Sequence, residues 1–223
     1  KNYKKLISYV LPMLNKVIPS RKSELNRLLA ESYYRTGQYN EAINFFNDFL
    51  SEQEEVDIST YFLLGNAYFL EKEYLDAIKF LEMVIEAPDS TMQYSSYILG
   101  ASYLHLEKYH YALQAFKKSS SYFFDLEIKE EAFYNYAKLL YQLDMSFENT
   151  FSVFQQYLDN YFTYQDEIND LVLKSLQNSS KHKEAFQALL DLETLNIDQK
   201  TAYQRLAFYL GVKEYNKDNY RNA

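Results

Sequence analysis

Apolar residues recur at helical spacing along much of the chain. Between Leu25 and Tyr34 they include positions 25, 28, 29 and 33, which is the spacing of one face of an α-helix. Similar apolar segments begin at Tyr61 and Ser96, with short polar stretches between them. The chain has only four Gly and three Pro, too few for the many turns of an all-β protein. The pattern therefore predicts an all-α chain with short turns.

Three of these segments are copies of one unit. In each, a small residue is followed three positions later by a tyrosine and twelve positions later by an alanine, and the units are 35 residues apart. The small residues are Ala30, Gly65 and Gly100, the tyrosines are Tyr33, Tyr68 and Tyr103, and the alanines are Ala42, Ala77 and Ala112. Small residues on two facing helices allow a close approach. Because one helix pair cannot bury its apolar face alone, neighbouring pairs are expected to stack.

The spaced residues resemble the tetratricopeptide repeat family. That family places Leu-Gly or Leu-Ala and a Tyr on a first helix, and Ala followed by an apolar residue, here Phe46, Leu81 or Phe116, on a second. The resemblance implies an all-α, right-handed superhelical solenoid of antiparallel helix pairs with about five to six repeats. Residues 154–161 look like repeats of bacterial envelope-assembly proteins of this family. The Tyr- and Asn-rich, Gly-poor composition is similar to that of bacterial proteins of the Bacteroidetes type.

We expect a single solenoid over residues 1–223, forming part of a longer protein. In this layout, residues 1–22 are the second helix of a preceding repeat and residues 200–223 start a further one. The full repeats are 23–57, 58–92, 93–129, 130–165 and 166–199. Pro12 lies inside the predicted helical segment Tyr3–Val17, where it would cause a bend or a late helix start.

Charge and composition narrow the classes of partner. The net charge of −8 argues against nucleic acid, whose binding depends on basic residues. The absence of Cys excludes disulfides, thiolate metal sites and cysteine nucleophiles. The longest mostly apolar run, Tyr61–Leu70, is too short to span a bilayer, so we expect no membrane insertion of this segment.

Residues that support chemistry are sparse. His105 and His110 are five positions apart, which does not place them on one helix face, and no His-Glu-x-x-His motif is present. The four Gly are scattered and form no phosphate-binding loop. We therefore expect no metal, no cofactor and no enzymatic activity.

The family resemblance also implies a binding surface. In such arrays the first helix of each pair lines a concave groove, which is the expected site for a peptide or helix of another protein. The positions that match are Arg27, Tyr34, Arg35, Phe62, Asn66, Phe69, Tyr94, Tyr97, Tyr134, Lys138 and Tyr141. Seven of these residues are aromatic, and exposed aromatics are typical of contact surfaces. The alternative is that packing between neighbouring repeats buries several of them in the core.

The sequence thus predicts a non-catalytic scaffold for protein–protein interaction. Arg27, Arg35 and Lys138 would pair with partner carboxylates, but Glu31 stands where a carboxylate-clamping repeat would carry Asn. Two other functions remain open: a sensor domain of a larger regulator, and a glycan-binding helical protein that uses groove tyrosines as platforms. The family resemblance favours the cell envelope or periplasm over the cytoplasm, although the Cys-free sequence does not itself decide the compartment.

Overall fold

The computed structural model describes residues 2–53, 56–178, 182–190, 194–195 and 197–217, and at a few helical positions within these ranges it describes the backbone alone. All regular elements within these ranges are helices. The chain forms two compact units, residues 1–132 and 133–223, each of which is described by itself.

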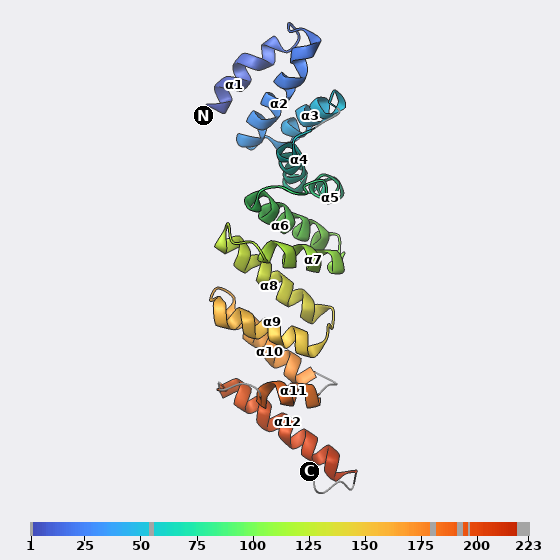
Figure 1. Cartoon of the computed structure of the whole chain (residues 1–223), viewed down its shortest axis with the longest axis vertical. Coiled ribbons are helices and arrows are strands. Elements are labelled where there is room, and N and C mark those ends of the chain that lie inside the picture. The colour runs from blue at the N-terminus through green and yellow to red at the C-terminus, as the bar shows by residue number, and fades with distance from the viewer. Residues whose placement is uncertain (1, 54–55, 179–181, 191–193, 196, 218–223) are drawn as a thin grey trace. The chain divides into compact units, whose positions relative to one another are not determined.

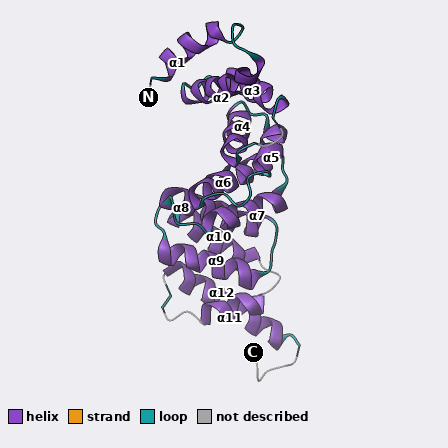
Figure 2. Cartoon of the chain, turned by 45° about the horizontal axis from the view of Figure 1, so that its top comes forward, coloured by secondary structure: helices purple, strands orange, loops and turns teal. Residues whose placement is uncertain are grey.

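The first unit consists of helix pairs connected by short turns (Figures 1 and 2). Its elements are α1 (Tyr3–Val10), a 3-10 turn η1 (Leu11–Met13), α2 (Pro19–Arg35), α3 (Tyr39–Ser51), α4 (Ile58–Leu70), α5 (Tyr74–Leu81), α6 (Asp89–His105) and α7 (Tyr109–Ser120). Helix α8 (Leu126–Gln142) begins in this unit and continues into the second. The pairs α2–α3, α4–α5 and α6–α7 are in contact, and α4 also contacts the first helices α2 and α6. The predicted all-α solenoid of antiparallel pairs is confirmed.

The second unit continues with α9 (Phe147–Asn160), α10 (Gln165–Asn178), α11 (His182–Leu190) and α12 (Ile197–Tyr215). Its core contains the fully buried side chains of Phe154, Tyr157, Ile168 and Leu189. The hydroxyl of Tyr157 accepts a hydrogen bond from the backbone N–H of Tyr164, at 3.1 Å, just before α10 begins. A buried tyrosine therefore fixes the turn between α9 and α10.

The small residues of the repeat lie where paired helices approach most closely. A Cβ atom added to Gly65 would stand 2.7 Å from Cγ of Leu81, and one added to Gly100 would stand 2.9 Å from a ring carbon of Phe116. Leu81 and Phe116 are both buried. These distances confirm that the second helix of each pair occupies the space that a side chain at the glycine would need.

Stacked aromatic rings connect the two helices of a pair in the first two repeats. Tyr33 stacks on Phe45 at 5.4 Å between ring centroids, and Tyr68 stacks on Phe80 at 5.6 Å. Phe45 and Phe80 are 35 residues apart, so the same aromatic contact recurs in both repeats. In the third repeat Ala115 replaces the phenylalanine, and Tyr103 instead stacks on Tyr111 at 5.2 Å.

The turns between the two helices of each pair share one backbone conformation, although their residues differ. Gly37, Lys72 and Glu107 have φ values of 77°, 66° and 57°, in the left-handed region, and they are 35 residues apart. In each turn the next N–H, that of Gln38, Glu73 or Lys108, bonds to the carbonyl of the repeat tyrosine at 2.9–3.0 Å. This is the Schellman arrangement, which usually has Gly at the left-handed position.

We therefore expect Glu107→Gly to stabilise the protein. Glycine adopts positive φ without steric cost, whereas a residue with a Cβ pays about 1 kcal/mol there. The measurement is the urea midpoint followed by circular dichroism. The control is Glu73→Gly. Glu73 has φ −85°, where glycine relieves no strain and only increases the conformational entropy lost on folding, so this variant should be less stable. Equal effects of the two substitutions would contradict this explanation.

The linker between α7 and α8 is fixed by the side chain of Gln93 on α6. The Gln93 amide donates to the carbonyl of Asp125 and accepts from its N–H, both at 2.8 Å. Ser119 Oγ donates to the Gln93 carbonyl at 2.9 Å. Gln93 is fully buried, so it replaces water as the partner of this linker backbone.

The N-terminal segment differs from the expectation for Tyr3–Val17. The helix neither bends nor starts late, but ends at Val10, and Pro12 lies in the following 3-10 turn. The proline ring removes the N–H that an α-helix would need and favours a turn instead. The chain then re-enters a helix at Pro19, the first residue of α2, where proline is well tolerated.

Candidate partner-binding face

Eight of the predicted binding residues lie on the first helices of the first unit. We call them together the first-helix face: Arg27, Tyr34 and Arg35 on α2, Phe62, Asn66 and Phe69 on α4, and Tyr94 and Tyr97 on α6. Arg35 is exposed and the other seven are half-buried. The sequence left open whether these aromatics belong to a surface or to the core, and the structure places them at the boundary. Phe62, Phe69 and Tyr97 rest with one side against the buried Ala77, Leu81 and Ile98.

Tyr34 and Asn66 connect α2 to α4 across this face. The Asn66 amide donates to the Tyr34 hydroxyl at 2.6 Å, and the Tyr34 ring has an edge contact with Tyr39 at 5.7 Å. Burial is the main reason why the pKa of Tyr34 lies above its ordinary value. The Arg35 guanidinium lies over the same ring at 5.8 Å. A polar pair and an exposed cation therefore mark the α2 end of the face.

Phe69 is part of an aromatic group that the sequence did not indicate. Its ring is 5.8 Å from Tyr74 on α5 and 6.4 Å from His105 on α6. Tyr74 and His105 stack at 4.3 Å with their planes nearly parallel. The only available signal was the position of His105 in the last turn of its helix, which alone does not indicate stacking.

Tyr94 connects the face to the α7–α8 linker. Its hydroxyl donates to a carboxylate oxygen of Asp125, and its ring has an edge contact with Phe124 at 6.4 Å. The Tyr94 hydrogen bond and the backbone N–H of Ile128 and Glu127 hold the pKa of Asp125 below its ordinary value. Phe123 and Phe124 of this linker and Leu126 at the start of α8 are exposed, and none of them was predicted as a binding residue.

The charge of Arg27 is compensated within its own helix. Its guanidinium bonds to Glu24 at 2.7 Å and to Glu31 at 2.5 Å. The hydrogen bond from Arg27 holds the pKa of Glu24 below its ordinary value. Such exposed pairs contribute little to stability, but they occupy the donors of Arg27. Arg35 is therefore the better-placed cation of α2 for a partner.

The other predicted residues, Tyr134, Lys138 and Tyr141, lie on the part of α8 that belongs to the second unit. Tyr134 stacks on Tyr164 at 4.1 Å, and burial is the first cause of its raised pKa. Lys138 is exposed, with its ammonium 5.7 Å from the Tyr134 ring, and Tyr141 is half-buried. Tyr134, Lys138 and Tyr164 therefore form a local aromatic and cationic group.

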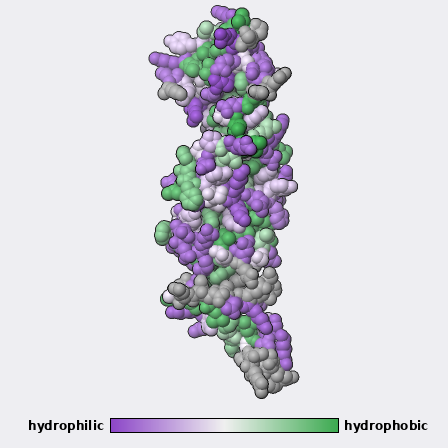
Figure 3. All heavy atoms as spheres, in the orientation of Figure 1, coloured by the Kyte–Doolittle hydropathy of each residue, from purple (hydrophilic) through white to green (hydrophobic). Residues whose placement is uncertain are grey.

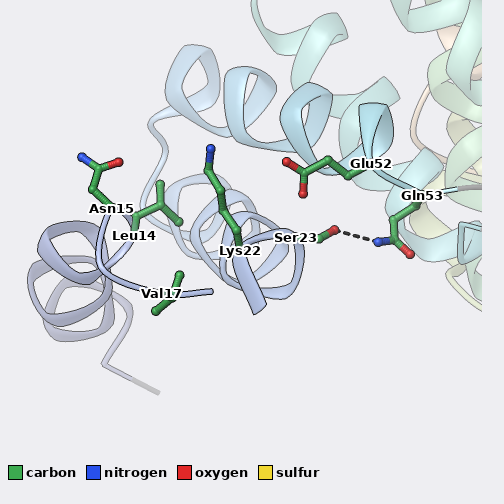
Figure 4. Close-up of a pocket in the computed structure, with 7 residues that line it drawn as sticks. All are labelled: Leu14, Asn15, Val17, Lys22, Ser23, Glu52 and Gln53. Carbon is green, nitrogen blue, oxygen red and sulfur yellow. Dashed lines mark hydrogen bonds between the residues drawn. The ribbon is translucent and has the colours of Figure 1, made fainter. Parts of the chain in front are cut away.

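A pocket of about 680 Å³ lies elsewhere, between the end of α3 and the segment joining η1 to α2 (Figure 4). Its lining residues are Leu14, Asn15, Val17, Lys22, Ser23, Glu52 and Gln53, none of which was predicted. The Gln53 amide donates to Ser23 Oγ at 2.8 Å across it. The lining mixes polar and apolar groups without a concentration of charge or a reactive group.

Two further searches covered only the described residues. No group of three or more His, Asp or Glu among them is arranged to hold a metal ion. No described helix is long and apolar enough to cross a membrane. In the view of Figure 3, hydrophilic and hydrophobic residues are interspersed over the surface, so hydropathy alone does not single out a site.

Two family profiles match the chain. Residues 49–119 match that of the anaphase-promoting complex, cyclosome, subunit 3, and residues 28–53 match a tetratricopeptide repeat. None of the curated protein sequences matches.

Several solved structures are similar. A crystal form of MamA is 19% identical with a TM-score of 0.58, covering 82% of this chain and 98% of MamA. The C-terminal part of a repeat protein from Cytophaga hutchinsonii is 17% identical with a TM-score of 0.55, covering 99% and 83%. The quorum sensor NprR from B. thuringiensis is 16% identical with a TM-score of 0.51, covering 99% and 68%. At these identities the similarity shows the fold.

Proposed function

Because this chain is a tetratricopeptide-repeat protein, we propose that it is a non-catalytic scaffold whose first-helix face binds an apolar segment of a partner protein. Repeats of this family typically support protein–protein interaction. The proposal covers both an extended and a helical segment, since both forms present apolar side chains to such a face. The expected concave groove is part of this proposal.

The observation that carries the proposal is the composition of α4. Its 13 residues, Ile58–Leu70, contain no charged residue, and apolar side chains surround the helix. Helices of this kind are normally buried on all sides. On α4, however, Phe62, Asn66 and Phe69 remain half-exposed. A partner segment lying across them would complete the burial that the composition of α4 favours.

Helix α6 extends the same surface. Between Asp89 and His105 it carries no charged residue, and Tyr94 and Tyr97 are half-exposed there. Tyrosine and phenylalanine lose little side-chain entropy on binding and dominate many interfaces. The aromatic positions of α4 and α6 are therefore the expected anchors.

The test uses site-specific photo-crosslinking in source cells. Benzoylphenylalanine replaces Tyr97 on the proposed face, or Tyr111, which is 63% exposed on the second helix α7. A partner crosslinked only from position 97 is then purified. Its affinity should fall at least about tenfold for Phe62→Ala and stay unchanged for Tyr111→Ala. Crosslinks confined to position 111, or equal affinity of both variants, would refute the proposal. An oligosaccharide crosslinked at position 97 would instead favour glycan binding.

A further inference from the structure

We infer that the segment bound by the first-helix face carries Lys or Arg side chains along one side, namely the side facing the N-terminal ends of α4 and α6. This inference rests on the proposed function, because it specifies the chemistry of the bound segment. It follows from the α4 and α6 part of the face, which carries no charged residue, and from linkers on one side of it that carry carboxylates but no Lys or Arg.

The first helices run side by side in the same direction. Phe69, late in α4, contacts His105 at the end of α6, whereas Gln93, early in α6, bonds to Asp125 just before α8. The C-terminal ends of these helices are therefore neighbours, and so are their N-terminal ends. The N-terminal ends of α4, α6 and α8 lie along one border of the face. The linkers leading into these starts belong to the same border.

The linkers on this border are acidic, and the last turns of α5 and α7 beside them carry Lys79, Lys117 and Lys118. Residues 51–57, 82–89 and 121–127 contain no Lys or Arg. We define the acidic edge by five exposed carboxylates that form no ion pair with any residue the structure describes: Glu52, Asp57, Glu86, Asp89 and Glu127. Their charges are available to a partner.

Helix stability explains only part of the acidic edge. Asp57 and Asp89 lie at the starts of α4 and α6, where a carboxylate interacts favourably with the helix dipole. Glu52 follows the last residue of α3, where the dipole disfavours a negative charge. Glu86 has φ 54°, a conformation that favours Gly or Asn over Glu. The φ of Glu86 disfavours any residue with a Cβ whatever its charge, so only the charge of Glu52 opposes local stability and favours a binding role.

The opposite border of the face carries both signs. Arg35, Lys72 and Lys108 lie in or beside the turns inside the pairs, together with Glu71, Glu73 and Glu107. It therefore gives no preference for the charge of a partner. The acidic edge alone selects by charge, attracting basic residues and repelling carboxylates.

The acidic edge is close enough to act on a segment bound over the aromatics. Phe62 follows Asp57, and Tyr94 follows Asp89, by five residues, which is about 7.5 Å along a helix axis. Tyr94 itself bonds to Asp125 within this border. A Lys or Arg side chain can place its stem on the aromatic rings and its charge beside the carboxylates.

The experiment selects binders from a displayed library of random peptides of about 15 residues, long enough for four helical turns. The bait is the full chain in four forms. These are the wild type, the face variant Phe62→Ala/Tyr97→Ala, an edge variant and a control. The edge variant is Glu52→Gln, Asp57→Asn, Glu86→Gln, Asp89→Asn and Glu127→Gln, which keeps side-chain shape and the Asp57 cap. The control is Glu71→Gln, Glu73→Gln and Glu107→Gln on the opposite border.

We expect the wild type to enrich peptides that combine apolar residues with a net positive charge. Their affinity should fall about tenfold in the edge variant, fall with added salt, and stay unchanged in the control. Enriched peptides that require Phe62 and Tyr97 but are neutral or acidic would overturn the inference and leave the proposed function standing. Peptides bound equally by the face variant, or no enrichment, would overturn both. Circular dichroism confirms that each variant is folded.

Discussion

Gly65→Ala is expected to destabilise the first unit by about 1–3 kcal/mol, although alanine is the better helix former. The helix-propensity gain is at most about 1 kcal/mol. Against it, the new Cβ would lie 2.7 Å from Cγ and 3.2 Å from the backbone nitrogen of Leu81. Leu81 is buried, so α5 as a whole would have to shift, and such overpacking typically costs more than the propensity gain.

The measurement is urea unfolding followed by circular dichroism, with hydrogen exchange of α4 and α5 to locate the loss. Position 30 provides the matched comparison, because the equivalent residue there is a fully buried Ala. Ala30→Gly should also destabilise, through lost packing and helix propensity. Gly65→Ala and Ala30→Gly are opposite substitutions at equivalent positions of two repeats, and both are expected to lower stability. Stabilisation by Gly65→Ala would refute the close approach of α4 and α5.

Gln93→Leu is expected to cost about 2–4 kcal/mol. The substitution removes both side-chain hydrogen bonds to Asp125 and leaves its N–H and carbonyl without these partners. Each unsatisfied buried group costs about 1–3 kcal/mol. Leucine is similar in size but cannot accept or donate, so the loss comes from polarity rather than from a cavity.

The urea midpoint measures this loss, and hydrogen exchange at the Asp125 amide localises it. The control is Gln114→Leu, because Gln114 is exposed on α7 and should change stability by less than about 0.5 kcal/mol. Equal stability of the Gln93 and Gln114 variants would show that water satisfies the linker when Gln93 is absent.

Much of the fold was predictable because its key residues recur. Ala30, Gly65 and Gly100 mark the close approaches, and the tyrosines three positions later mark the aromatic stacks, so spacing alone identified the helix pairs. The turns were also located, but not their left-handed geometry. Lys72 and Glu107 adopt it without being glycine, because the flanking helices and the Schellman hydrogen bonds impose it.

Contacts that occur in only one repeat could not be predicted from the sequence. Gln93 looks like an ordinary polar helix residue, and only the folded linker gives it two backbone partners. Lys129 is similar: it is buried, donates to the Ser120 carbonyl at 2.9 Å and lies over the Phe123 ring, and burial lowers its pKa. No periodic pattern encodes such one-off interactions.

For the candidate site, the family register placed the residues on the correct helices but could not give their environment. Phe62 and Tyr97 were equally compatible with core and surface, and the structure makes them half-buried. Arg27 was expected to meet a partner, but the structure gives it Glu24 and Glu31, which lie one turn away on the same helix. Whether these positions bind a partner remains a prediction.

The composition of α4 also has a consequence during synthesis. This helix leaves the ribosome before α5 and α6, the neighbours that cover most of its apolar surface. Until they emerge, the apolar surface of α4 that they later cover is exposed to solvent, which favours aggregation of nascent chains or binding by chaperones. A protein truncated after Leu70 would keep this surface of α4 exposed and is expected to aggregate. A protein truncated after α7 would retain α5 and α6, which cover it.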